Sequence, residues 1–118
     1  MDIDAKDEDG TAVLHVAAIL DHDEIAKFLI QKGTNVDAKG GDGGTALHKA
    51  ACLGRSRVAK LLIENGAYIE VRNNQGATAL DGLKVDWGTT QFIAQLLQIK
   101  ADRKKVEVGR TEVAKLLG

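Results

Sequence analysis

The sequence lacks several features on which other classes of protein depend. It has no proline, one cysteine and only 3% aromatic residues. A single cysteine cannot form an internal disulfide, which excludes a disulfide-stabilised fold and favours a reducing compartment. So few aromatic side chains do not suit a deep ligand pocket. No early apolar run resembles a signal peptide or a membrane span, so we expect a cytoplasmic protein that does not bind membranes.

Neither sign of charge predominates in the whole chain. The net charge of −1 favours neither nucleic acid nor an anionic membrane as a partner. The charges are nevertheless segregated: residues 2–24 include eight acidic residues and one lysine, and residues 100–115 include six basic and three acidic residues. The resulting net charges of −7 and +3 fit two solvated ends of an elongated molecule, and they also fit electrostatic steering of a partner.

What the sequence does contain is a repeat with a period of 33 residues. The middle copy begins at Gly43 and has the pattern T-x-L-H-x-A-A from Thr45 to Ala51. Its glycine, leucine, histidine and two alanines recur 33 residues earlier as Gly10, Leu14, His15, Ala17 and Ala18. The glycine and the leucine recur again 33 residues later, as Gly76 and Leu80.

A period of this length, with a glycine turn and this signature ahead of a second apolar helix, resembles the ankyrin repeat. The resemblance covers nearly all of residues 3–97. It implies an all-α fold, an ankyrin-repeat solenoid of stacked helix-turn-helix units with β-turn fingers. We expect a single domain, residues 1–118, with repeats at about 7–39, 40–72 and 73–100 and a C-terminal cap at 101–118.

Apolar spacing places the helices of each repeat. The first helix of the first repeat is expected at about 13–20, with its leucine and alanines facing the core. Second helices are expected where apolar residues recur at spacings of three and four, around Ile25–Ile30, Val58–Ile63 and Ile93–Leu97.

Polar residues and glycines mark where these helices begin and end. Thr45 and Thr78 stand at N-cap positions, where a side-chain oxygen accepts a hydrogen bond from a free backbone N–H. Gly33 and Gly66 follow the second helices and predict their ends. Asp21 takes the place that a glycine has in the middle repeat, so we expect left-handed backbone there.

The third repeat departs from the pattern. The segment Gly82-Leu83-Lys84 stands where the middle repeat has Lys49-Ala50-Ala51, and two extra residues precede its second helix. Residues 109–117 then echo residues 54–62, which belong to the start of a second helix. We therefore expect a terminal repeat and a capping helix that covers the apolar face of Phe92, Ile93, Leu96 and Leu97.

The cysteine and two of the histidines are the residues from which a catalytic or zinc site could be built. Cys52 follows His48 by one helical turn, the least that a thiolate–imidazole pair needs, and His15 with these two would give three zinc ligands. No fourth ligand has suitable spacing, and in similar repeats the histidine forms hydrogen bonds in the turn. The glycine-rich residues 40–44 lack the G-K-[ST] of a phosphate-binding loop. We expect no enzyme activity, metal or cofactor.

The resemblance implies that the protein binds another protein on a concave face, through its finger tips and the inner side of its first helices. The corresponding finger residues here are Asp7, Asp9, Thr11, Asp42, Gly44, Asn73, Gln75 and Ala77. Those of the first helices are Ile19, Leu20, Cys52, Leu53, Val85 and Trp87. An exposed apolar strip with an acidic rim suits a partner with apolar anchors flanked by lysine or arginine. The protein itself is expected to be a monomer.

A second interpretation remains open. The segment is then a structural spacer or a regulatory tail of a larger ankyrin-repeat protein. Residues 3–6 align with residues 36–39, the end of a repeat, so the pattern begins part-way through a unit. A third interpretation, an enzyme, requires that Cys52→Ala abolish some activity.

Overall fold

Two rows of helices make up this protein. The computed structural model describes residues 13–84, 87–96 and 102–117. Regular structure in these ranges is entirely helical, which confirms the expected all-α fold. The helices are α1 (Val13–Leu20), α2 (Asp23–Gln31), α3 (Ala46–Leu53), α4 (Ser56–Glu64), α5 (Ala79–Gly82), α6 (Trp87–Leu96) and α7 (Arg103–Leu117).

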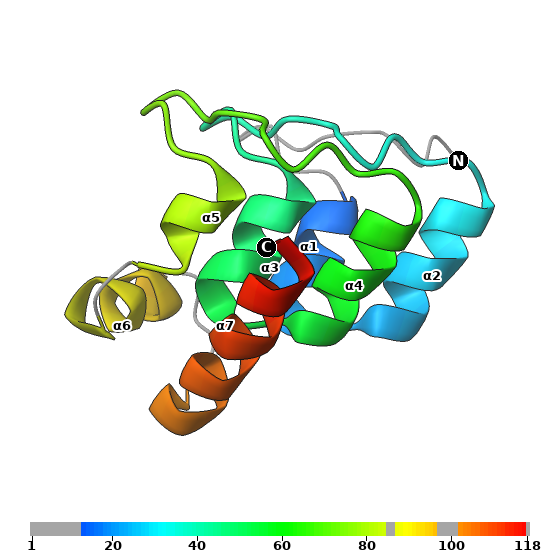
Figure 1. Cartoon of the computed structure of the whole chain (residues 1–118). Coiled ribbons are helices and arrows are strands. Elements are labelled where there is room, and N and C mark those ends of the chain that lie inside the picture. Colours follow the sequence, from blue (N-terminus) through cyan, green and yellow to red (C-terminus); the bar gives the residue numbers. More distant parts are fainter. Residues whose placement is uncertain (1–12, 85–86, 97–101, 118) are drawn as a thin grey trace.

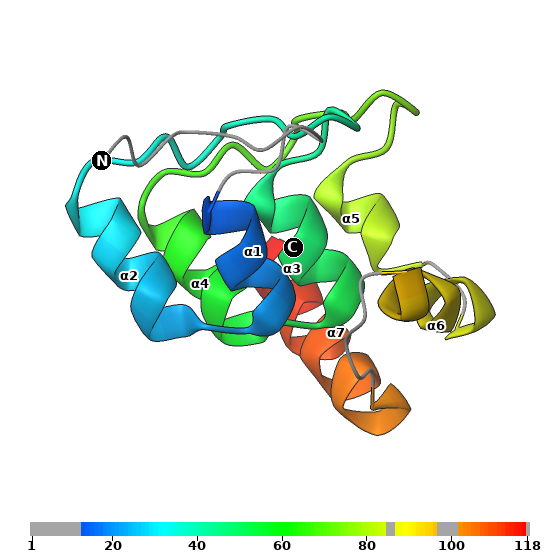
Figure 2. The ribbon, with the colours of Figure 1, turned by 180° about the vertical axis from the view of Figure 1, so that it is seen from behind.

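The helices stack in order along the molecule. One row consists of α1, α3 and α5, with α3 packed against both neighbours, and the other consists of α2, α4 and α7, with α4 packed against both (Figures 1 and 2). The loops that connect successive layers project from one edge, above the helices. This arrangement is the solenoid that the repeat predicts.

Local signals end these helices as the sequence indicates. The backbone at Asp21 is left-handed, with φ of 60°, and the glycine at the equivalent place after α3, Gly54, has φ of 69°. Gly33 and Gly66 follow the second helices with φ of 90° and 87°. The turns at Asp21 and Gly54 let the chain reverse direction in a few residues, so that both helices of a unit pack side by side, and Gly33 and Gly66 end the second helices ahead of the loops that lead to the next unit.

Capping interactions fix the starts of α3 and α5. The hydroxyl of Thr45 accepts a hydrogen bond from the backbone N–H of His48 at 3.5 Å, which confirms Thr45 as an N-cap. At α5 the backbone N–H of Thr78 donates to the Asp81 carboxylate at 2.9 Å. The backbone N–H groups at the start of a helix have no acceptor within the helix, so each cap stabilises the start of the helix that follows a finger.

Small side chains occupy the contact between the layers. The alanines of the repeat signature are buried, at 0–2% exposure, namely Ala17, Ala18, Ala50 and Ala51. Leu14, Leu47 and Leu62 are also no more than 2% exposed. Alanine lets helix axes approach closely, while the leucines fill the space between the two rows. The core is therefore a continuous row of contacts between units rather than one central cluster.

The C-terminal helix packs in a different place from the one expected. Helix α7 lies against α3 and α4, where it buries Val106 and Val113 at 3% and 0% exposure. Any Cβ on Gly109 would overlap the carbonyl oxygen of Gly54, so glycine is required where α7 crosses the end of α3. The expectation that α7 covers Phe92 is wrong, since Phe92 is 60% exposed, while the side chains of Ile93, Leu96 and Leu97 lie outside the described residues. In Figure 1, α6 lies to one side of the two rows.

Arg110 makes the contacts of a second-helix arginine. Its Nε and Nη2 donate to the carbonyl oxygen of Cys52 at 2.9 and 2.7 Å. In the preceding unit Arg55 Nε donates to the carbonyl oxygen of Ile19, the residue 33 positions before Cys52, at 3.1 Å. We therefore interpret α7 as the second helix of the third unit and α6 as an insertion, while the repeat boundaries remain a prediction.

Candidate functional site

The finger between the first two units is a tight glycine turn. Gly43 N–H donates to the Gly40 carbonyl at 2.9 Å, and Gly40 N–H donates to the Gly44 carbonyl at 2.8 Å. Gly43 has φ of 77°, and a Cβ there would lie 2.8 Å from the backbone nitrogen of Asn74. Glycine is thus needed twice over, for the turn and for close approach of the next finger.

The next finger, residues 73–77, has an asparagine at its base. The Asn73 side-chain oxygen accepts from the N–H groups of Gln75 and Ala77 at 2.9 and 3.0 Å, and Asn73 N–H donates to the Ala77 carbonyl at 2.9 Å. Asn73 therefore shapes the loop from inside. Gln75 lies at the exposed tip.

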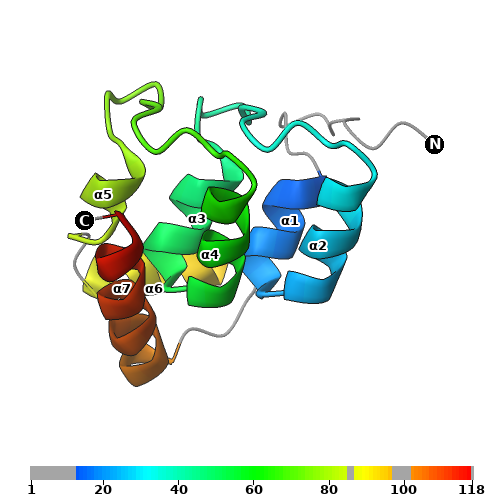
Figure 3. The same cartoon turned by 45° about the vertical axis from the view of Figure 1, so that its right-hand side comes forward.

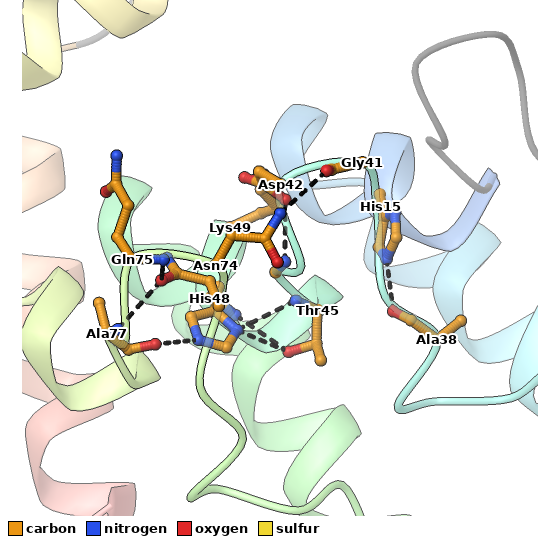
Figure 4. Close-up of polar contacts among 12 residues, drawn as sticks. His15, Ala38, Gly41, Asp42, Thr45, His48, Lys49, Asn74, Gln75 and Ala77 are labelled. Atoms are coloured by element: carbon orange, nitrogen blue, oxygen red, sulfur yellow. Dashed lines mark hydrogen bonds and ion pairs between the residues drawn. The ribbon is translucent and has the colours of Figure 1, made fainter.

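Hydrogen bonds connect the two fingers directly (Figure 4). The backbone N–H of Asn74 donates to the Asp42 carbonyl at 2.9 Å, and its side-chain amide donates to the Gly41 carbonyl at 3.2 Å. Neither bond involves a side chain of the first finger. The two tips are consequently held in one relative position by backbone groups of the first of these fingers and by the backbone and side chain of Asn74, which leaves Gln75 at the tip of the next finger available for contacts.

His48 supports this pair of fingers from below. Its Nδ1 accepts a hydrogen bond from Thr45 N–H at 3.0 Å, so the ring proton must be on Nε2, which donates to the Ala77 carbonyl at 2.9 Å (Figure 4). His15 Nε2, in a ring that is 1% exposed, likewise donates to the Ala38 carbonyl at 2.8 Å. The interpretation of both histidines as hydrogen-bonding residues is confirmed. With both ring nitrogens engaged, His48 is not placed to deprotonate Cys52.

Two carboxylates beside the fingers are held ionised. Partial burial raises the pKa of Asp42, but the Lys49 ammonium at 2.8 Å and the Gly44 N–H at 2.8 Å outweigh it, so the net effect lowers that pKa. The hydrogen bond from the Thr78 backbone N–H lowers the pKa of Asp81. In both cases the groups that support a finger favour the charged form of the acid.

Only part of the predicted partner-binding set lies at the surface. Gln75 and Asp42 are exposed, Leu20 is 43% exposed, and Asn73, Ala77 and Cys52 are partly exposed, whereas Gly44 is buried. Asp7, Asp9, Thr11 and Val85 lie outside the described residues, as does the side chain of Trp87. The structure thus brings together the polar finger tips of two units, whereas Leu20 lies at the C-terminal end of α1, away from the fingers (Figure 2).

The expected apolar strip is wrong at two positions. Ile19 is 9% exposed and Leu53 is 3% exposed, so both belong to the interior. Side chains of the following unit reach the ends of α1 and α3, where Arg55 donates to the Ile19 carbonyl and Arg110 donates to the Cys52 carbonyl. Leu80 differs in the opposite sense: it stands at the repeat position of the buried Leu14 and Leu47 but is 48% exposed.

Sequence reasoning missed two residues that organise this region. Asn74 stands 33 residues after Gly41, so the period alone could have shown that these two meet. Arg110 lies in the segment that echoes residues 54–62 and corresponds to Arg55. Its partner could not be found from that echo, because it depends on which helix α7 packs against.

Leu80 borders a hollow at the C-terminal end of the stack. The hollow has a volume of about 450 Å³ and is open to solvent, and its lining includes Tyr68, Ile69, Arg72 and Leu117. In the described residues, no group of three or more His, Cys, Asp or Glu side chains has the arrangement of a metal site. None of the described helices combines the length and apolar character that crossing a bilayer requires.

Comparison with protein-family models identifies the repeat. The model described as ankyrin repeats in three copies matches residues 1–73. The matched region includes α1 to α4 and ends where the second described finger begins. No curated protein matches the chain significantly.

Proposed function

Because the chain belongs to the ankyrin-repeat family, whose members are generally protein–protein interaction modules, we propose that it binds a partner protein through its finger row without catalysing a reaction. The finger row consists of the loops at residues 40–44 and 73–77. The observation that carries the proposal is the pair of hydrogen bonds from Asn74 to the neighbouring finger. They fix two solvent-facing tips relative to each other before any partner arrives.

Such pre-organisation favours binding for a physical reason. A flexible loop loses conformational entropy when it is ordered against a partner, and a loop that is already fixed loses less. His48, bonded to Thr45 and Ala77, fixes the finger row to α3. The row therefore has the rigidity of the helices beneath it, and Gln75 at its tip is presented at a defined position.

The burial of Ile19 and Leu53 changes the expected partner. The surface that remains is mainly polar, with Asp42 and Gln75 on the fingers and Leu20 as an exposed apolar side chain at the C-terminal end of α1. Asp42 is already paired with Lys49, so a basic group of the partner would share that carboxylate. We expect an interface that relies on hydrogen bonds to the finger tips, with apolar contact confined to the end of α1.

The proposal is tested by capturing partners from the source cell with three forms of the protein. Gln75→Arg places a long charged side chain in the finger row without removing a described hydrogen bond. Gln31→Arg is the matched control, since it makes the same change at an exposed residue of α2. Wild type and Gln31→Arg should capture the same protein, and Gln75→Arg should retain at least about tenfold less, the effect of a hot spot.

Equal retention by both variants contradicts binding through the finger row. It would leave the spacer interpretation as the better one if wild type also retained no specific protein. Circular dichroism of the three forms provides the check that both substitutions leave the helices intact.

A further inference from the structure

The two ends of the stack expose side chains that the middle unit buries. At the N-terminal end the exposed positions belong to α1 and α2. Ile25 is 46% exposed, whereas its counterparts Val58 and Val113 are both 0% exposed. Val13 is 44% exposed, although its counterpart Ala46 is 0% exposed. The positions of Val13 and Ile25 are buried in the later units, each of which packs against a preceding unit, so these positions face the preceding layer.

The C-terminal end shows the converse pattern. Leu80 is 48% exposed, while Leu14 and Leu47 at the same repeat position are 2% and 1% exposed. Ala114 of α7 is exposed, and its counterparts Ala26 and Ala59 are both 0% exposed. These positions are covered in every unit that has a unit after it. The molecule thus ends in two different faces, which we name the head (Val13, Ile25 and Phe28) and the tail (Ile69, Leu80 and Ala114).

Head and tail are the two sides of the contact that already joins the layers. Helix α1 packs on α3 and α2 on α4, and the same contacts recur between α3 and α5 and between α4 and α7. Figure 3 shows the three layers side by side, with α1 and α2 at one end and α5 and α7 at the other. A further copy of α1 and α2 placed beyond α5 and α7 by the same displacement would bring a head against a tail.

We propose that copies of this chain associate head to tail, the head of one covering the tail of the next. The exposed apolar residues of the head and tail fit a second copy of the chain, because residues at the same repeat positions are buried against a neighbouring unit inside the stack. Phe28, 53% exposed on the head, stands at the position of Leu61, which is partly buried against the core. The hollow beside Leu80 gives the tail room for a side chain of that size.

Charge complementarity supports the same occupant. Among the described residues, 21–27 at the start of α2 include three acidic residues and one lysine, a net charge of −2, and 102–115, most of them in α7, include five basic and three acidic residues, a net charge of +2. Opposite charge at the two ends favours the approach of a head to a tail and disfavours two heads together. An association of this type uses different surfaces on the two partners, so it can continue to longer chains unless it closes into a ring.

Sedimentation velocity of the wild-type protein over a wide concentration range is the first measurement. The weight-average sedimentation coefficient should rise with concentration and should continue to rise beyond the value of a dimer. A coefficient that stays at the monomer value throughout overturns the proposal, and it would restore the expectation of a monomer.

Two single-face variants then test the direction of the contact. Ile25→Glu places a charge in the head and Leu80→Glu places one in the tail, both at half-exposed positions. Each variant alone should be monomeric, with self-association weakened at least about tenfold, the effect of a hot spot. Mixed in equal amounts, they should form a dimer and nothing larger, because one intact tail meets one intact head. Phe92→Glu, a matched change at an exposed residue of α6, should associate like wild type.

The mixture distinguishes this contact from a symmetric one. If either face paired with itself, one of the two variants would still dimerise alone, and that result overturns the proposal. A mixture that remains monomeric overturns it as well. Circular dichroism establishes that the variants are folded, and a second pair, Phe28→Glu and Ala114→Glu, repeats the test at other exposed residues of the same two faces.

Discussion

Residues 13–72 and residues 73–117 build the same kind of layer by different routes. In the first region each first helix is followed almost at once by its second helix, across Asp21-His22 or Gly54-Arg55. In the second region residues 83–102, including α6, separate α5 from α7. Even so, α7 packs on α4 as α4 packs on α2. The position of a layer is therefore set by the side chains at the contact and not by adjacency in the sequence.

The largest expected loss of stability comes from removing α7, and comparison with removal of α6 tests which of the two helices completes the third layer. A chain that ends at Asp102 loses the burial of Val106 and Val113 and should lose more than about 3 kcal/mol of unfolding free energy. The exposed faces of α3 and α4 should then bind a hydrophobic dye. Replacing residues 86–99 by a glycine-serine linker should cost less. Urea denaturation of both forms gives the ranking, and the reverse order would mean that α6 is the true second helix.

The crossing of α7 over α3 is the next most sensitive point. Gly109→Ala introduces a methyl group where the Gly54 carbonyl lies, so α7 must shift, at a cost of about 1–3 kcal/mol. Thr111→Ala, on the exposed side of α7, serves as the control. Denaturation that gives the two variants equal stability would show that the helices do not cross at this glycine.

Arg110 and Arg55 make equivalent contacts in the two regions, so the stability lost on removing each side chain can be compared. Arg110→Ala removes two hydrogen bonds to the Cys52 carbonyl and one to the Thr90 hydroxyl, and should cost about 2 kcal/mol. Arg55→Ala removes one described hydrogen bond, to the Ile19 carbonyl, and should cost about 1 kcal/mol. Thermal and chemical unfolding of both single variants measure the difference. A larger loss for Arg55→Ala contradicts the equivalence of the two contacts.

Features of the fold that depend on residues close together in the sequence could be predicted from it, and features that depend on packing between distant segments could not. Thr45 and Asp21 were placed correctly, because a cap and a left-handed turn involve only residues a few positions away. The sequence could not decide between two candidates for the second helix of the third unit, because Ile93–Leu97 and Val113–Leu117 carry the same apolar pattern, and we interpret α7 as that helix. Only packing against α4 separates the two, and Gly109 opposite Gly54 decides it.

The candidate site shows the same division. The role of His48 followed from its place in the repeat, and its bonds to Thr45 and Ala77 agree with it. The exposure of Ile19 and Leu53 was expected from the resemblance, which places the inner side of the first helices on a binding face. That inference failed because a helix between two neighbours is buried on more than one side, which helical spacing within a single element does not reveal.

The absence of proline allows a smaller test in which both regions should respond alike. Ala46 and Ala79 are the first helical residues of α3 and α5, where proline breaks no helix hydrogen bond. The preceding threonines have ψ of 174° and 173°, which proline requires of its neighbour. Ala46→Pro and Ala79→Pro should each stabilise by about 0.4–1 kcal/mol in chemical denaturation. Destabilisation by both would mean that the helices start elsewhere.

The smallest expected effect is a pH dependence shared by the two regions. Asp42 and Asp81 both have pKa values below the ordinary 3.8, so folding favours their ionised forms. Their stabilisation is complete well above that value and is lost as the pH falls through the lowered pKa values. Asp42→Asn should flatten the acid limb of a plot of unfolding free energy against pH. An unchanged acid limb would show that the carboxylate interactions add nothing.

The inserted α6 also has a consequence for the order of folding. Arg55 and Ile19 are 36 residues apart in the chain, whereas Arg110 and Cys52 are 58 apart. Closing the longer loop costs only about 0.4 kcal/mol more, so the insertion hardly affects equilibrium stability. Folding rates, however, decrease as native contacts become more distant in sequence. We therefore expect the first two units to form the nucleus on which the last helix docks, so that the C-terminal layer is completed after the layers that it covers.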